Sequence, residues 1–600
     1  MFQSFEVKTR PQDGPPRLEA LRKAMGAEGV DGFLVPRADM HQGEYVSAHD
    51  DRLAWLTGFT GSAGFAAVLS DVAGVFVDGR YRLQVRAQAD LSVFTPVNWP
   101  ETKLADWLCA HAPAGAIIAY DPWLHTIREV ADLSAKLAES GRKLQPCANL
   151  VDRVWSDQPA PPQGKVFCQL PEYAGENRTE KRARIAADLR DAGHGSAVLT
   201  LPDSISWLIN IRGADIPRIP IVQSLAILHD DGRVDLFLHP VKLQGEDLNL
   251  GDGVSASPPG AFAPALEALA GVVRVDRETA PQAVLDHLAK GTAQIVFERD
   301  PCILPKACKN AAEIAGTRAA HLRDGAAMVE FLAWLDAQDP ATLTEIDVAT
   351  SLEGFRQATG MLKDISFETI CGTGPNGAIV HYRVTEETNR RITPGDLLLV
   401  DSGGQYVDGT TDITRTMATG TPAPDAVAAF TRVLQGMIAV SRARWPSGLA
   451  GRDLDALARA PLWRAGQDYD HGTGHGVGVY LSVHEGPQRL SRVSEAKLLP
   501  GMILSNEPGY YREGAFGIRI ENLVVVQEAD VPEGGDRHRA MLSFETLTYV
   551  PVDVRLVDAS ALSAEERDWL NAYHAEVAEK IGPNVSDAAR DWLIRATRAI

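Results

Sequence analysis

Two segments of the chain repeat one pattern. Residues 53–61 read LAWLTGFTG and residues 205–213 read ISWLINIRG, so each places Trp-Leu near its start and glycine at its end. Each segment follows a short apolar run and precedes further alternating apolar stretches, which is the order of strands and helices in an α/β domain. We therefore predict two copies of one α/β unit. The alternative is a chance similarity between two short segments.

The length of the chain requires several domains. A chain of 600 residues exceeds what one hydrophobic core accommodates, so two to four domains are expected. The stretch SDQPAPPQG at 156–164 is rich in proline and polar residues, which predicts a linker. From about residue 321, helical segments mix with alternating stretches, as is typical of an α+β domain. The predicted domains are residues 1–155, 156–320 and 321–600.

Several helices and strands are predicted from local patterns. Asn310 and Glu313 form a capping-box pattern, and Gly325 interrupts the helical spacing that follows, so 309–338 is one weakened helix or two helices. The basic stretch 178–190 is expected to be a solvated helix face within a helical segment at 176–192. Other predicted helices lie at 326–338, 424–444 and 452–465. Predicted strands lie within 397–416, 471–484, 517–527 and 541–550.

Composition excludes some classes of protein. A net charge of -20 and a pI near 5.2 argue against nucleic-acid binding, because phosphates require a basic surface. The N-terminus lacks an apolar signal segment and no apolar run is long enough for a membrane span, so we expect no membrane association and a cytoplasmic location. Six cysteines without a Cys-x-x-Cys pair do not form a disulfide framework.

Two aspartates lie on a predicted hairpin. Asp401 follows the apolar run 397–400, and Asp412 shares one face of the next predicted strand with Thr414. Asp408 precedes Gly409 in a turn dipeptide, so we expect it to bond to the local backbone. Taken alone, such a pair of aspartates is more often a solvated face than a site.

Histidines and further carboxylates follow. In HGTGHGVG (471–478), His471 and His475 lie four residues apart, or roughly 13 Å along a straight strand, so both cannot bind one small ion. The glycines lack the order of a phosphate-binding loop, and HEGPQ lacks the second histidine of a zinc-protease helix. Glu507 ends an apolar run. Arg519 and Glu521 alternate with apolar residues and need compensation if they are buried.

Five of these residues form a candidate ligand set: Asp401, Asp412, His475, Glu507 and Glu521. Four carboxylates would repel one another unless cations lie between them, and two divalent ions would bring the sum near neutrality. Oxygen-rich ligation with one nitrogen suits Mn²⁺, and also Co²⁺ or Zn²⁺. Spacing alone does not bring these side chains together.

The order of the motifs resembles the pita-bread metallopeptidases, the group that includes methionine aminopeptidase, prolidase and aminopeptidase P. The motifs GTGPNGAIVHY, GTGHGVG, HEGP, NEPGYY and GIRIEN carry this resemblance. The chain is most similar to the long, three-domain Xaa-Pro aminopeptidases, since FTGSAG, VDGRY, SFETLTYVP and DWLNAYH extend the resemblance over nearly its whole length. The fold implied is two creatinase-like N-terminal α/β domains followed by a C-terminal pita-bread catalytic domain.

The resemblance also implies roles for the candidate residues. Asp401 would bind one of two divalent ions, His475 and Glu507 the other, and Asp412 and Glu521 would bridge both. Glu507 would also act as the general base. The residues expected to contact the substrate are His381, His471, His484 and Arg519. Of these, His381 would lie by the scissile carbonyl, His484 would stabilise the anionic oxygen, and His471 would seat the residue after the scissile bond.

The activity implied is hydrolysis of an N-terminal Xaa-Pro bond by a hydroxide that bridges the metals. The proline nitrogen carries no N–H, and attack on the carbonyl does not need one. The partners expected are peptides with proline in second position and a second copy of the chain in a homodimer. The alternatives are a prolidase-type dipeptidase of the same fold and a non-enzymatic interaction module. Creatinase is disfavoured because it uses no metal.

Four other residues are expected to be structural. His321, His538 and His574 lie outside the motifs, so we interpret each as a core or turn residue. Arg80, in DGRY, is expected to pair with Asp78 or a neighbour.

Overall fold

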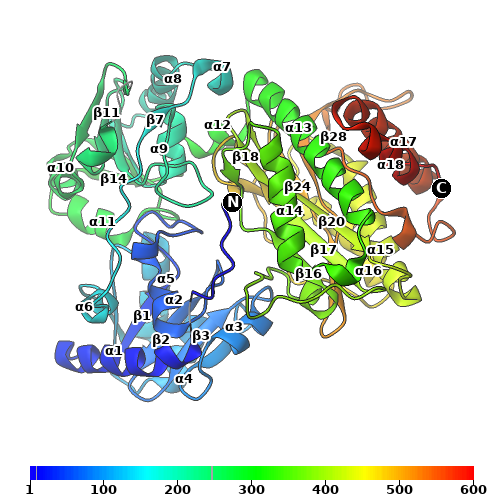
Figure 1. Cartoon of the computed structure of the whole chain (residues 1–600). Helices are drawn as coiled ribbons and strands as arrows, with labels where there is room; N and C mark the ends of the chain where they lie inside the picture. The colour runs from blue at the N-terminus through cyan, green and yellow to red at the C-terminus, as the bar shows by residue number, and fades with distance from the viewer. Residues whose placement is uncertain (9, 245–247) are drawn as a thin grey trace. The chain divides into compact units, whose positions relative to one another are not determined.

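The computed structural model describes residues 1–8, 10–244 and 248–600. The chain divides into two compact units, one formed by Lys8–Ile303 and the other by Leu304–Ile600 together with Met1–Val7 (Figure 1). We call them the N-terminal unit and the catalytic-type unit. The predicted boundaries of three domains stay a prediction. None of the helices in the described residues has the length and apolar character needed to cross a membrane.

The N-terminal unit contains two six-stranded sheets with the same topology. The first sheet has the order β4-β3-β2-β1-β5-β6 and the second the order β12-β11-β10-β8-β13-β14. In both, the third strand pairs antiparallel with its two neighbours, and the other neighbouring strands are parallel. The predicted duplication of an α/β unit is therefore confirmed. The strands of the first sheet are β1 (Gly32–Pro36), β2 (Phe65–Leu69), β3 (Ala73–Val77), β4 (Thr95–Asn98), β5 (Ile117–Tyr120) and β6 (Lys143–Pro146); those of the second are β8 (Ser196–Leu199), β10 (Leu225–His229), β11 (Val234–Phe237), β12 (Val254–Ser257), β13 (Val272–Val275) and β14 (Gln294–Phe297).

The two echoed segments occupy equivalent places in these sheets. Segment 53–61 begins within helix α2 (Arg52–Thr57) after β1, and segment 205–213 begins within helix α9 (Pro202–Leu208) after β8. The side chains of Leu56 and Leu208 are fully buried. The repeated pattern thus marks the helix that follows the central strand of each sheet.

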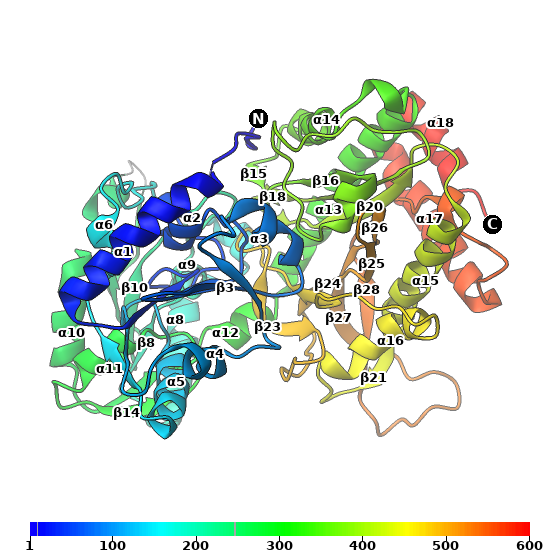
Figure 2. The same ribbon diagram turned by 90° about the horizontal axis from the view of Figure 1, so that it is seen from below.

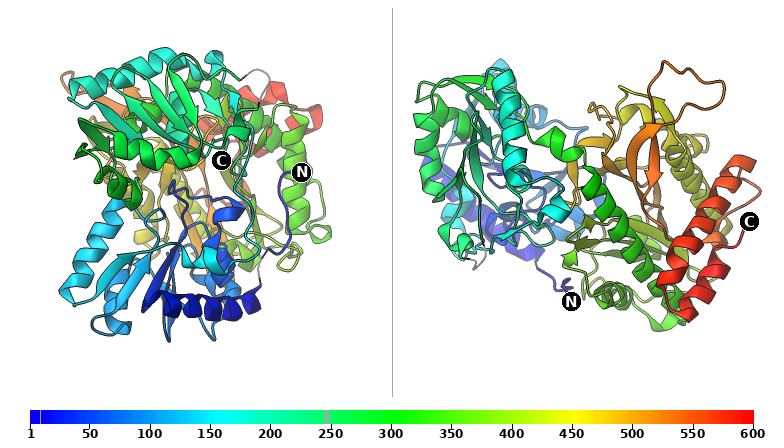
Figure 3. Two further views of the ribbon diagram at one scale, coloured as in Figure 1. Left: turned by 90° about the vertical axis from the view of Figure 1, so that its left-hand side faces the viewer. Right: turned by 90° about the horizontal axis from the view of Figure 1, so that it is seen from above.

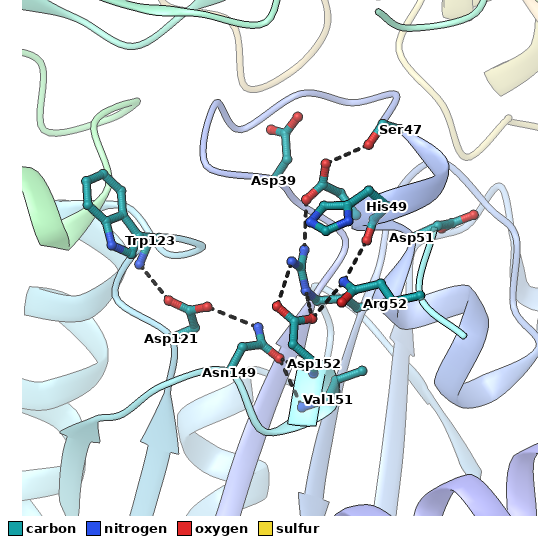
Figure 4. Close-up of polar contacts among 12 residues, drawn as sticks. Asp39, Ser47, His49, Asp51, Arg52, Asp121, Trp123, Asn149, Val151 and Asp152 are labelled. Carbon is teal, nitrogen blue, oxygen red and sulfur yellow. Dashed lines mark hydrogen bonds and ion pairs between the residues drawn. The ribbon is translucent and has the colours of Figure 1, made fainter. Parts of the chain in front are cut away.

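An ion-pair network fastens α2 to the end of the first α/β unit. Arg52 Nε lies 2.6 Å from Asp152 Oδ1 in α6 (Leu150–Val154), and Arg52 Nη1 lies 3.0 Å from Asp50 Oδ1 (Figure 4). Asn149 caps α6 and donates through Nδ2 to Asp121, 3.0 Å away. These contacts join α6, the last helix before the predicted linker, to the rest of the first α/β unit.

Helix α8 (Arg178–Asp191) confirms the helical segment predicted there, and it confirms the solvated face only in part. Lys181 is only 1% exposed. Its ammonium group donates to the Trp207 carbonyl at 2.9 Å and to Asn210 Oδ1 at 2.7 Å. A lysine stem can cross apolar surface while its head group bonds to polar atoms, which is why a basic sequence gave a partly buried face.

Helix α13 (Ala311–Asp336), which follows the short helix α12 (Ile303–Ala307), is one continuous helix. The predicted capping box is present at Asn310 and Glu313. Gly325 lies within this helix. A larger residue would be crowded there, because its Cβ would come within 3.0 Å of the Tyr549 carbonyl oxygen. Helix α13 packs against α14, α17 and α18, and the last two (red) lie beside it (green) in Figure 3. The other helices of the catalytic-type unit are α14 (Glu345–Ala358), α15 (Pro424–Ser441), α16 (Arg452–Trp463), α17 (Ala564–Ile581) and α18 (Asp587–Ala596).

Strands of three sheets position the candidate site. A three-stranded sheet has the order β16-β17-β20, a six-stranded sheet the order β21-β28-β27-β24-β22-β23, and β25 pairs with β26. Helix α15 packs against β24 and β28 of the larger sheet (Figure 2). The strands are β16 (Ile370–Thr373), β17 (Leu397–Ser402), β20 (Ile413–Ala418), β21 (Arg444–Pro446), β22 (Gly474–Gly476), β23 (Glu485–Leu490), β24 (Ile503–Asn506), β25 (Gly509–Arg512), β26 (Phe516–Arg519), β27 (Asn522–Ala529) and β28 (Met541–Thr546).

One predicted strand is mostly absent. The stretch 471–484 was expected to alternate as a strand, but only Gly474–Gly476 is extended in β22. A register shift follows His475, and Tyr480 adopts a left-handed φ of 49°. The glycines at alternate positions allow close backbone approach, since a Cβ at Gly474 would lie 1.9 Å from the Ser505 carbonyl oxygen.

Candidate metal centre and active site

The five predicted ligands lie on strands, or directly beside strands, of the catalytic-type unit. Asp401 lies on β17 opposite Thr414 of β20, and Asp412 comes directly before β20. His475 is the middle residue of β22. Glu507 follows β24, which pairs with both β22 and β27, and Glu521 lies between β26 and β27.

The structure brings ligand atoms from these strands together. One ligand atom each of Asp412, His475 and Glu521 lies within 4.8 Å of the others. His475 Nε2 is 3.4 Å from Asp412 Oδ2 and 3.5 Å from Glu507 Oε1. His475 Nδ1 is 2.9 Å from the Gly476 carbonyl oxygen, so Nδ1 carries the proton and the lone pair of Nε2 faces the carboxylates. Asp401 joins the cluster through Arg519, whose Nη2 is 2.7 Å from Asp401 Oδ2.

Three carboxylate oxygens in this cluster lack partners. Asp401 Oδ1, Asp412 Oδ1 and Glu521 Oε1 are buried, and none accepts a hydrogen bond from the described residues. A buried acceptor without a partner is costly, and native proteins rarely leave one unexplained. One oxygen without a hydrogen-bond partner from each of three acids, beside the imidazole nitrogen Nε2 of His475, fits the donor set of hard to borderline divalent cations.

The pKa values of the acids in this cluster show that too little positive charge lies near them. Burial raises the pKa of Asp412 and of Glu521 well above their usual range, and the neighbouring carboxylates raise both further. Burial likewise raises the pKa of Glu507 to about 7, although Arg519 opposes the shift. One guanidinium cannot balance four acids, so cations in the cluster would restore their ionised form.

Arg519 connects the ligands to the other candidate residues. Its side chain is 1% exposed. Besides Asp401, it donates to Tyr511 Oη at 2.6 Å and to the Val380 carbonyl oxygen at 3.3 Å. Tyr511 Oη in turn lies 2.9 Å from His471 Nε2. The guanidinium therefore links Asp401, Tyr511 and the backbone at Val380 through hydrogen bonds. Its contact with substrate stays a prediction.

The three predicted substrate histidines differ in their relation to the ligands. The ring of His484 lies edge-to-face on that of His475, with centroids 4.3 Å apart. His471 reaches the cluster through Tyr511 and Arg519. His381 is half-buried and follows Val380, whose carbonyl binds Arg519. The roles of all three stay predictions.

Comparisons with known proteins place the chain in a family. The model of metallopeptidase family M24 matches residues 315–528, two creatinase/prolidase N-terminal domain models match 17–154 and 157–313, and a model of the C-terminal region of peptidase M24 matches 540–600. A probable Xaa-Pro aminopeptidase P of Coccidioides posadasii is 39% identical, covering 99% of this chain and 95% of its own length. The chain belongs to the Xaa-Pro aminopeptidase P family of M24 metallopeptidases.

Two further relatives support this membership. Aminopeptidase P2 of Arabidopsis thaliana is 38% identical over 97% of this chain and 88% of its own length. The crystal structure of an X-prolyl aminopeptidase of Caenorhabditis elegans, described as a cytosolic enzyme with a di-nuclear active site, superposes with a TM-score of 0.92 at 32% identity. It covers 98% of this chain and 99% of that one. The predicted family and fold class are thus confirmed.

One sequence interpretation near the site is wrong. Asp408 was expected to bond to the local backbone of its turn, but its carboxylate binds Arg323 of α13, at 3.1 and 2.9 Å. A turn sequence does not reveal a cation supplied from a distant helix. The ion pair holds the β17–β20 hairpin region against α13, outside the ligand cluster.

The structural interpretations of other residues are confirmed. His321 is buried with Nδ1 2.8 Å from the Thr317 carbonyl oxygen, and His574 Nε2 accepts from the Val552 amide at 3.1 Å. His538 lies in an exposed turn. Arg80 pairs with Asp78, 2.7 Å away.

Sequence reasoning missed three residues that contact residues of the candidate site. Thr414 Oγ1 donates to Glu521 Oε2 at 2.7 Å. Ser505 Oγ donates to Glu507 Oε1 at 3.1 Å and accepts from the His475 amide at 2.9 Å. Tyr511 is described above. Thr414 was already placed on the face of Asp412, which was the available signal. Nothing in the sequence pointed Ser505 or Tyr511 at the ligands.

Proposed function

We propose that the chain is a metal-dependent aminopeptidase that removes the N-terminal residue of peptides with proline in second position. The observation that carries this proposal is the set of orphaned carboxylate oxygens beside His475 Nε2, in a chain that matches Xaa-Pro aminopeptidases over its full length. Asp401, Asp412, His475, Glu507 and Glu521 would hold two divalent ions. When bound, such ions lower the pKa of a water molecule and polarise the scissile carbonyl.

The chain's own residues supply the remaining chemistry in this proposal. Glu507 can accept the proton of the attacking water through its carboxylate, which the bound cations would keep ionised. His484, packed on His475, donates a hydrogen bond to the oxygen that becomes anionic. His381, His471 and Arg519 would seat the substrate around the scissile bond. None of these contacts requires an N–H on the proline nitrogen.

Other features are proposed from the relatives and from the donor set. We propose Mn²⁺ as the metal, with Zn²⁺ or Co²⁺ as alternatives, because carboxylates outnumber the imidazole and no thiolate is present in the cluster. A cytoplasmic location is proposed, supported by the relative described as cytosolic. A homodimer is proposed from the family alone.

The test compares two aspartates of one hairpin region. Asp412→Asn should abolish hydrolysis of an Xaa-Pro-Xaa tripeptide by protein loaded with Mn²⁺, with unchanged circular dichroism. The matched control is Asp408→Asn, which removes a carboxylate bound to Arg323 and should keep full turnover. Chelation should abolish wild-type activity, and Mn²⁺ should restore it. Full activity of Asp412→Asn would refute its assignment, and a preference for Xaa-Pro dipeptides would favour the prolidase alternative.

A further inference from the structure

One buried carboxylate binds most of the loop that carries His381. Glu345 is the first residue of α14 and is 0% exposed. Its Oε1 accepts from the Thr373 amide at 2.8 Å, and its Oε2 accepts from the Tyr382 hydroxyl and the Arg390 amide, both at 3.0 Å. Asn376 Nδ2 lies 3.0 Å from each oxygen. These contacts lie along the motif GPNGAIVHY (374–382), which contains His381.

Side-chain and turn contacts keep this loop in shape, and those of Glu345 are among them. A 3₁₀ turn, η6 (Gly374–Ala378), is followed by residues 379–396, all described and without helix or strand. A chain without repetitive structure is ordered only by side-chain and turn contacts. Glu345 supplies such contacts near both ends of the loop, and its own amide also donates to the Arg390 carbonyl at 3.0 Å.

His381 is consequently held on both flanks. On one side, the Val380 carbonyl accepts from Arg519, which also binds Asp401. On the other side, the Tyr382 hydroxyl donates to Glu345 and lies 2.9 Å from the Thr388 carbonyl oxygen. The contact of Arg519 thus links the loop next to His381 to the ligand cluster, and the contact of Tyr382 links it to α14. Loss of either contact would let the ring shift, and a displacement near 1 Å can lower a rate about 10²-fold.

We propose that Glu345 is a positioning residue for His381 in the peptidase reaction. The inference rests on the proposed function. Glu345 acts through Tyr382 and Asn376, not on substrate. A carboxylate is required because every polar atom around it donates, and an amide at this position would point its own N–H groups at one of those donors. Glu345→Gln keeps the volume and removes this complementarity.

The experiment measures kcat and KM for an Xaa-Pro-Xaa tripeptide with the full-length, Mn²⁺-loaded chain. Glu345→Gln should lower kcat by about 10-fold to 100-fold with metal content unchanged. The matched control is Glu353→Gln, on the same helix. Glu353 is also buried, and its Oε1 accepts from the Phe2 amide at 2.6 Å and from Gln357 Nε2 at 2.8 Å. This control should change kcat less than about twofold.

A double-mutant cycle separates positioning from general destabilisation. If Glu345 acts through His381, adding Glu345→Gln to His381→Ala should cause no further loss of kcat/KM. Tyr382→Phe, which removes one hydroxyl, should lower kcat less than Glu345→Gln and should also have no effect in the His381→Ala background. Tyr382→Phe carries the test if Glu345→Gln does not fold.

Three results would overturn the proposal. An equal loss with and without His381, or unchanged kcat in the folded Glu345→Gln and Tyr382→Phe variants, would exclude positioning while wild-type activity upheld the proposed function. Absence of wild-type turnover on Xaa-Pro peptides would overturn both proposals together.

Discussion

Glu485, the residue after His484, lies between two lysines in the interior of the catalytic-type unit. Lys306 Nζ is 2.8 Å from Glu485 Oε2, and Lys309 Nζ pairs with Glu485 Oε1. The three side chains are at most 3% exposed. The cluster therefore carries one buried positive charge in excess. We predict that replacing the glutamate destabilises the protein far more than replacing one lysine.

The magnitudes follow from the charges that each variant leaves behind. Glu485→Gln leaves two buried ammonium groups that had bound one carboxylate, and such neighbours repel by about 2–4 kcal/mol at an effective dielectric constant of 20. Breaking a buried ion pair from one side costs about 3–5 kcal/mol in total. Lys309→Met loses one charge-assisted hydrogen bond but also removes the repulsion with Lys306, so the net cost should be about 1 kcal/mol.

The assay is differential scanning calorimetry of the full chain, using the transition that shifts on Mn²⁺ addition to identify the catalytic-type unit. At about 2 °C per kcal/mol, Glu485→Gln should lower its Tm by about 6–10 °C and Lys309→Met by about 2 °C. Lys306→Met/Lys309→Met/Glu485→Leu should recover much of the loss, because no charge remains buried. Equal Tm shifts for Glu485→Gln and Lys309→Met would refute the charge count.

Two further predictions concern single acids. Asp408→Asn should lower the free energy of unfolding by about 1 kcal/mol through loss of the partly exposed pair with Arg323, measured by urea denaturation; an unchanged midpoint would contradict a stabilising pair. Metal-free protein should become less stable from about pH 5 to about pH 8, because burial raises the pKa of Glu507 from 4.5 to about 7 on folding, and the stability of its protonated form is lost as pH rises through the folded value. Thermal melts in chelator should show this slope, reduced in Glu507→Gln; an identical slope in that variant would exclude Glu507 as its source.

The fold was predictable where local pattern and tertiary structure agree. The Trp-Leu segments recur because each α/β unit needs the same apolar helix after its central strand, and the capping box at Asn310 is a local hydrogen-bond pattern. The buried ammonium of Lys181 and the partner of Asp408 were not predictable, since each depends on atoms far away in the sequence. Most of the strand expected at 471–484 is absent because the register shifts after His475 and Tyr480 turns the backbone left-handed, so only Gly474–Gly476 pairs.

The candidate site divides in the same way. The residue types and order of the ligands identified them through family resemblance, but spacing could not show that Asp412, His475 and Glu521 converge, because they come from separate strands. Contacts that hold the histidines were also beyond sequence reasoning. In the sequence, Glu345 is only an acid at the N-terminus of a helix. Its hydrogen bonds to the loop 373–390 appear only in the structure.

The way this chain treats its buried acids bears on the presence of metal. Glu345 and Glu485 are fully buried, and each is met by several donors or by two ammonium groups. Asp324 binds Arg356 and the Tyr406 hydroxyl. Within the described residues 304–600, the buried carboxylate oxygens left without a hydrogen-bond partner belong to Asp401, Asp412 and Glu521 alone. The other buried acids named here have hydrogen-bond or ion-pair partners, whereas one oxygen of each of these three acids has none. Bound cations would supply the positive charge that these oxygens lack.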